Sequence, residues 1–150
     1  YWENSGSYGF LTGTTRASDS YVRASFLVKE ITQKESKEYI SAVPGKKYDN
    51  QAIASVTGVM RSVSVPLGIM HATQANNAAT LWRTIVDHKN KVFYFDSATS
   101  PNTFWISLSK LDFSENTSVK KIQLSNGEIF AGDVSSQFIP TKSFNFLPAK

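Results

Sequence analysis

The sequence predicts an α+β domain, in which two helices are packed on a meander of antiparallel strands. Three observations support this class: apolar residues recur at helical spacing in the first half, β-rich runs bounded by turn residues fill the second half, and no internal repeat is visible. The 150 residues are 41% hydrophobic and 19% charged, which is enough apolar surface for a core and too little charge for a disordered tail. We therefore expect one domain over residues 1–150.

The helical periodicity predicts a first helix at about 18–33, with Ser18 as its N-cap. The apolar positions expected on its buried side are Tyr21, Ala24, Val28 and Ile31, and Val22 and Phe26 widen this apolar stripe. The polar stretch that follows has room for a short helix at 36–42. A second helix is expected to run to Ser62 from a cap at Asp49 or Asn50. Its apolar side is expected to hold Ile53, Val56, Met60 and Val63.

The pattern of the second half of the chain predicts β-strands. Runs at 81–87 and 91–97 are rich in β-forming residues, and the short polar connection between them indicates a hairpin. Further strands are expected at 103–109 and 119–124, and a turn at 125–127. Aromatic residues occur in both alternation classes of these strands, so both faces of the sheet are apolar. An antiparallel sheet usually has one wet face, and the pattern therefore indicates that a further layer covers this one.

Composition excludes several classes of function. The net charge is +4, but the lysines and arginines are dispersed, which argues against a nucleic-acid partner. The longest apolar runs have the length of a strand, so no membrane span is predicted. The chain has no cysteine, which excludes disulfides, thiolate zinc sites and a cysteine nucleophile among these residues. The sequence has two histidines, His71 and His88, but no Gly-x-Ser-x-Gly elbow for a nucleophilic serine. Both histidines are therefore interpreted as having no catalytic role. No metal or cofactor is expected.

The most distinctive stretch is 11–26, which reads LTGTTRASDSYVRASF. It resembles the choloylglycine hydrolase family of linear amide C–N hydrolases, the bile salt hydrolases and penicillin V acylases. Members of this family have a Leu-Pro-Gly loop that leads into a helix reading Arg-Phe-Val-Arg-Ala. Further blocks match in order, namely SVSVPLG at 62–68, the hairpin at 81–97 and the strand at 100–113. The resemblance covers nearly the whole chain.

The resemblance implies an N-terminal-nucleophile hydrolase with an αββα sandwich, of which this chain matches the C-terminal half. The cysteine nucleophile of the family belongs to the other half. We therefore expect a fragment, inactive as given, of an enzyme that hydrolyses a small-molecule amide such as a conjugated bile acid, penicillin V or an acyl-homoserine lactone. Its partner would be the rest of the parent chain. An isolated half should expose apolar sheet surface and associate into homo-oligomers.

A second interpretation is a non-catalytic relative that serves as a small-molecule binding or scaffold protein. The feature that favours it is Ser20, which stands where the family has the first arginine of its Arg-Phe-Val-Arg-Ala motif. The resemblance leaves the compartment open, although the bacterial periplasm or secretion is favoured over the cytoplasm.

The same motif suggests the site residues. The family's first arginine favours the thiolate nucleophile electrostatically, and Arg16, one helical turn before Ser20, is the candidate for a displaced cation. The alternative for Arg16 is a loop arginine that binds carbonyl groups or solvent. Arg23 keeps the second arginine and is expected to pair with Asp19 on the helix surface. The aromatic residues that could line an acyl pocket, or alternatively belong to the core, are Tyr8, Phe10 and Trp105.

Overall fold

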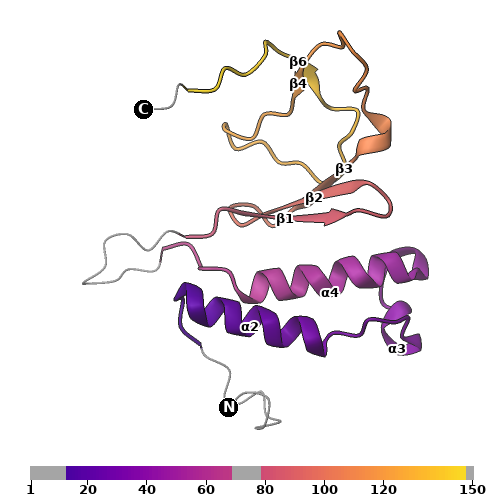
Figure 1. Cartoon of the computed structure of the whole chain (residues 1–150), viewed down its shortest axis with the longest axis vertical. Helices are drawn as coiled ribbons and strands as arrows, with labels where there is room; N and C mark the ends of the chain where they lie inside the picture. Colours follow the sequence, from indigo (N-terminus) through magenta and orange to yellow (C-terminus); the bar gives the residue numbers. More distant parts are fainter. Residues whose placement is uncertain (1–12, 69–78, 148–150) are drawn as a thin grey trace. The chain divides into compact units, whose positions relative to one another are not determined.

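The computed structural model describes residues 13–68 and 79–147 (Figure 1). The chain divides into two compact units, Tyr1–Ile85 and Val86–Lys150, each of which is described by itself. The first unit holds the helices. The second holds the strands from the end of β1 onward. The class is α+β, as the sequence predicts. In the described residues, no helix is both long and apolar enough to cross a membrane.

The helices of the first unit match the predicted ones in number and order within the described part. α2 runs beside α4 (Figure 1), and α3 and a 3-10 turn also pack against α4. The bounds are Ala17–Glu30 for α2, Lys37–Ile40 for α3, Pro44–Lys46 for the 3-10 turn and Tyr48–Ser62 for α4. The short helix that the polar stretch allows is therefore real, and Ser36 caps it by accepting a hydrogen bond from the backbone N–H of Tyr39.

The predicted N-caps of the two long helices are wrong. Arg16 precedes the first residue of α2, so Ser18 lies inside the first turn. α4 likewise begins one residue before Asp49, and its N-cap is Lys47, which makes no side-chain capping bond. The Asn50 side chain instead donates to the carbonyl oxygen of Pro44 at 2.7 Å. This bond joins the helix to the 3-10 turn before it, so the Asn50 side chain is not available to cap the helix.

The predicted apolar sides of the helices are also wrong in part. Tyr21 and Val28 of α2 are 74% and 49% exposed, whereas Val22 and Phe26 are half-buried. At 100° per residue these two pairs face different sides of the helix. Of the four positions predicted for the apolar side of α4, Val56 is exposed and the other three are half-buried, whereas the buried residues of the helix are Gln51 and Val59. Because apolar residues surround both helices, spacing alone cannot say which side faces inward.

The larger sheet has the strand order β1-β2-β3-β5. β2 and β3 are antiparallel, with Phe95 opposite Phe104, while β5 pairs with β3 in parallel. The predicted antiparallel pairing is confirmed for β2 and β3, whereas the parallel strand β5 was not predicted. β4 and β6 form a separate two-stranded antiparallel sheet. The bounds are Trp82–Asp87 (β1), Val92–Ser97 (β2), Thr103–Ser107 (β3), Lys120–Lys121 (β4), Gly132–Asp133 (β5) and Ile139–Pro140 (β6).

The strands predicted at 103–109 and 119–124 are shorter than expected. The first ends at Ser107 and passes into a 3-10 turn, Leu108–Lys110, and only Lys120–Lys121 of the second is a strand. The hairpin at 88–90 is confirmed. In its turn the Asp87 carboxylate accepts bonds from the backbone N–H and the side-chain amide of Asn90, at 2.9 and 2.7 Å, and His88 is exposed.

Aromatic rings lie on both faces of the β2–β3 pair, as the alternation predicts. Directly opposed residues of an antiparallel pair share a face, and the rings of Phe95 and Phe104 stack at a centroid distance of 5.0 Å. Phe130 meets Phe104 edge-on at 5.8 Å. On the other face Tyr94 and Trp105 contact each other at 5.9 Å. The core of this unit gathers around the first face, where Phe104 is buried.

Candidate functional site

The most notable polar arrangement in the first unit lies where the chain enters α2. The guanidinium of Arg23 donates from Nη1 to the carbonyl oxygen of Thr14 at 3.1 Å and from Nη2 to the hydroxyl of Ser20 at 3.4 Å. Ser20 and Arg23 are three residues apart on one helix, a spacing that brings side chains together one turn apart. The loop before α2 is thus held to the helix by a positive charge that lies against Ser20.

Thr14 links the same loop to the first turn of α2. Its hydroxyl donates to a carboxylate oxygen of Asp19 and accepts the backbone N–H of Arg16 at 3.3 Å. The negative charge of Asp19 is well placed there, because the unpaired N–H groups of the first turn make a helix N-terminus positive. Thr14, Asp19, Ser20 and Arg23 therefore form one connected group, which we name the entry cluster.

Two of the predicted site residues, Arg16 and Ser20, lie in the described part of the chain. Arg16 is exposed, and its guanidinium makes no hydrogen bond within the part of the chain that the structure describes. Ser20 is half-buried, and the arginine beside it is Arg23. The i to i+3 spacing that brings Ser20 and Arg23 together is visible in the sequence, whereas the bond from Arg23 to Thr14 depends on the path of the loop before α2. Tyr8 and Phe10 lie outside the described residues.

A second link joins two of the blocks that carry the family resemblance. Ser64 accepts a hydrogen bond from Nε of Arg83 at 2.6 Å and donates to the carbonyl oxygen of Met60 at 2.9 Å. Val65 donates its N–H to the Thr80 hydroxyl at 2.9 Å, and its carbonyl oxygen accepts the Thr80 N–H at 3.0 Å. The segment after α4 is therefore fixed to the start of β1, and Arg83 belongs to this link.

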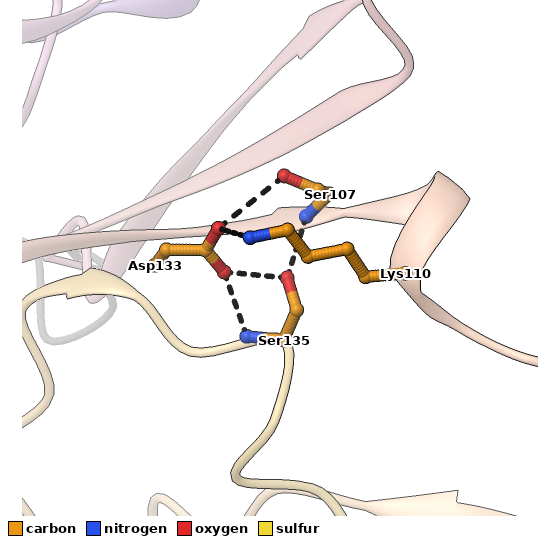
Figure 2. Close-up of polar contacts among 4 residues, drawn as sticks. All are labelled: Ser107, Lys110, Asp133 and Ser135. Atoms are coloured by element: carbon orange, nitrogen blue, oxygen red, sulfur yellow. Dashed lines mark hydrogen bonds and ion pairs between the residues drawn. The ribbon is translucent and has the colours of Figure 1, made fainter.

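The second unit contains a compact polar group that the sequence did not reveal. Figure 2 shows Asp133 accepting Nζ of Lys110 at 2.7 Å on one oxygen and the hydroxyl and N–H of Ser135 at 2.6 and 2.9 Å on the other. The Ser135 hydroxyl also accepts the N–H of Ser107 at 2.8 Å. The group thereby connects β5 to the end of β3. The sequence could not predict this group, because it depends on the parallel pairing of β3 with β5, which no local sequence pattern indicates.

This group is suited to holding strands together and not to nucleophilic catalysis. Hydrogen bonds from Lys110 and then from Ser135 hold the pKa of Asp133 well below its ordinary value. A carboxylate with a lowered pKa is a poor general base for the serine hydroxyl. In residues 13–68 and 79–147, no group of three His, Asp or Glu side chains could hold a metal ion.

The family model described as linear amide C–N hydrolases, choloylglycine hydrolase family, matches residues 2–122, most of the chain. The chain belongs to the choloylglycine hydrolase family. The resemblance inferred from the motifs is thereby confirmed, and the fold is that of an N-terminal-nucleophile hydrolase, as the structural match below shows. The entry cluster and the link at Ser64 both lie inside the matched range.

Individual members of the choloylglycine hydrolase family are also similar to this chain. The chain is 36% identical over 149 residues to a penicillin V acylase of Pectobacterium atrosepticum, covering 97% of this chain and 40% of that protein. It is 43% identical to the penicillin V acylase of Agrobacterium tumefaciens, whose solved structure superposes with a TM-score of 0.77 and is matched over 99% of this chain and 44% of that one. The chain therefore spans less than half the length of each of these relatives.

Proposed function

We propose that these residues form the C-terminal half of an enzyme that hydrolyses the amide bond of a small molecule, with penicillin V as the first substrate to test. The observation that carries the proposal is the identity of 36% and 43% to two proteins named penicillin V acylase, over nearly all of this chain. In this proposal residues 1–150 are one part of a single larger domain. The rest of the parent chain is its partner.

The nucleophile in this proposal lies outside the 150 residues. They contain no cysteine, whereas the family resemblance implies a cysteine whose own α-amine acts as the base. The chain alone is then inactive. It supplies charge and shape to a reaction centre that the other half completes.

The role proposed for the entry cluster is electrostatic. The family has an arginine where this chain has Ser20, and the guanidinium of Arg23 donates to the Ser20 hydroxyl at 3.4 Å. Arg23 would then provide the positive charge of the missing arginine, favouring the thiolate before attack and the oxyanion that forms after it. Arg16 is the other candidate for this charge. It is exposed, so its position is less well fixed for such a role.

The test compares the longest natural reading frame that contains these residues with the 150-residue chain. Each is incubated with penicillin V, and release of the free amine is measured. We expect turnover by the longer protein and none by the 150 residues. A longer protein that folds and carries a cysteine nucleophile, yet releases no amine from penicillin V, a glycine-conjugated bile acid or an acyl-homoserine lactone, would overturn the proposal.

The second candidate is a non-catalytic relative that binds such a molecule without cleaving it. Ser20, in place of the family arginine, is the observation that favours it. Calorimetric titration with penicillin V separates the two functions, because heat of binding without amine release supports the binding protein.

A further inference from the structure

The loop between β4 and β5 contains the pair Asn126–Gly127, the one place in the sequence where glycine follows an asparagine. Both residues are exposed, and Gly127 has a positive φ of 78°. A Cβ placed on Gly127 would meet no atom within 4 Å apart from those of its two neighbours in the chain, so the space around it is open. The pair therefore lies in a turn that solvent reaches and that no neighbouring group crowds.

The backbone nitrogen of Gly127 is available for chemistry. Within the described residues its N–H makes no hydrogen bond, whereas the N–H of Asn126 donates to a carboxylate oxygen of Glu128 at 2.8 Å. Because glycine has no side chain, its nitrogen can approach the side-chain carbonyl carbon of the preceding asparagine without steric hindrance. An unengaged nitrogen next to an amide carbonyl in an exposed turn is the arrangement that intramolecular amide attack needs.

We propose that Asn126 is a site of spontaneous deamidation in the folded protein. The Gly127 nitrogen attacks Cγ of Asn126, so that a new N–C bond closes a succinimide ring while the bond from Cγ to the side-chain nitrogen breaks. The side-chain nitrogen leaves as ammonia, which carries away the proton that the Gly127 nitrogen loses. Water then opens the ring at one of its two carbonyl carbons. One opening gives aspartate, and the other gives isoaspartate, in which the backbone runs through the former side chain.

The other asparagines in described turns serve as internal controls. Asn116 is also exposed and also has a positive φ, of 68°, but the residue after it is the β-branched Thr117. In the hairpin, the Asn90 side chain donates to Asp87 at 2.7 Å and is followed by Lys91. In both cases the residue that follows the asparagine has a side chain, which hinders attack of its backbone nitrogen on the asparagine side-chain amide. Asn90 and Asn116 should therefore keep their side-chain amides under conditions in which Asn126 loses its own.

Deamidation would change the charge of this turn. Bonds from the backbone N–H groups of Glu128 itself and of Asn126, together with a weaker bond from the Asn126 side-chain amide, lower the pKa of Glu128, so this neighbour is a carboxylate at neutral pH. The product places a second carboxylate beside it, and the net charge falls by one from +4. The two charges repel, and solvent screens the repulsion.

The experiment is peptide mapping by mass spectrometry of the full natural protein after incubation in mildly alkaline buffer, with isoaspartate detected by an isoaspartyl methyltransferase. We expect acid products at Asn126, predominantly isoaspartate, amides retained at Asn90 and Asn116, and complete loss of the signal in Asn126→Gln, whose longer side chain does not form the five-membered ring. In Gly127→Asn, whose new residue tolerates a positive φ but adds a Cβ, conversion at position 126 should fall sharply.

A synthetic peptide spanning residues 123–130 provides the reference for the intrinsic reactivity of the pair. If the peptide deamidates while Asn126 in the folded protein keeps its amide, the turn protects the residue and the proposal is wrong. It is also wrong if Asn116 is converted as fast as Asn126, because the glycine would then have no effect.

Discussion

The side chain of Gln51 on α4 holds the backbone at Ser36, accepting the Ser36 N–H at 3.1 Å, and its amide also donates to the carbonyl oxygen of Lys34 at 3.0 Å. Gln51 is only 2% exposed. A buried amide that satisfies one donor and one acceptor of the backbone fixes the loop between α2 and α3 against α4. Nothing in the sequence distinguishes Gln51 from other polar residues near the start of a helix.

Replacing Gln51 with leucine should therefore destabilise the protein. The leucine fills similar space but leaves the half-buried Ser36 N–H without the acceptor it has in Gln51, which costs about 1–3 kcal/mol for a group that stays unsatisfied. The Lys34 carbonyl oxygen loses one of its two donors and keeps the Thr32 hydroxyl at 3.0 Å. The free energy of unfolding, measured by urea titration, should fall by that amount. Gln33→Leu is the matched control. Gln33 also bonds backbone carbonyls but is exposed, so water can replace it and a change within about 0.5 kcal/mol is expected. Equal losses in both variants would contradict the role of burial.

If the entry cluster serves the amidase, Arg23→Met should reduce kcat/KM for penicillin V by about 10²–10³-fold, as removal of a group that stabilises an oxyanion does. The comparison is Arg16→Met, for which we expect a much smaller loss. Arg23→Lys keeps the charge but not the two-pronged contact with Thr14 and Ser20, so it should fall between. A large loss in Arg16→Met with little change in Arg23→Met would restore Arg16 as the displaced cation.

The Lys110–Asp133 pair should make a small contribution that depends on salt. The two side chains are 61% and 30% exposed, and exposed pairs contribute about 0.2–1 kcal/mol. Lys110→Met should lose that amount in low salt and less in high salt. Lys121→Met is the control, because Lys121 bonds only the neutral side chain of Gln123 among the described contacts. The same loss in both lysine variants would show that the pair contributes nothing specific.

Asp133 should also make the stability depend on acid pH. Its pKa is lower in the folded protein than in the unfolded chain, because Lys110 and Ser135 donate to the carboxylate. The stabilisation is thus fully present above the unfolded pKa and is lost as the pH falls below about 4, where an ordinary aspartate takes up a proton. Asp133→Asn should be less stable at neutral pH, and its free energy of unfolding, measured by urea titration at several pH values, should fall less steeply below about pH 4. If this decrease is as steep in the variant as in the natural protein, other carboxyl groups cause the acid dependence.

The contrast between these sites shows what the sequence can predict. Helices α2 and α4 were found because periodicity is local, and the family because its motifs are contiguous in sequence. The parallel strand at Gly132–Asp133 was missed because two residues have no pattern, and the bonds beside it come from distant parts of the chain, from Lys110 to Asp133 and from Ser107 to Ser135. The bond from Arg23 to Thr14 could not be predicted for a related reason, because it depends on the path of the loop before α2. Helical spacing alone brings together side chains three and four residues apart, such as Ser20 and Arg23.

The hairpin turn between β1 and β2 offers a stabilising change. Lys91 has a φ of 55°, in the left-handed region, and its carbonyl oxygen accepts the N–H of Leu108 at 2.9 Å. A side chain in this conformation costs about 1–2 kcal/mol, which glycine does not pay, although glycine loses more freedom on folding. Lys91→Gly should therefore raise the free energy of unfolding by up to about 1 kcal/mol in urea titration. Lys89→Gly in the same turn, at a position without positive φ, should lower it. If both substitutions lower the stability, the backbone conformation of Lys91 is not a source of strain.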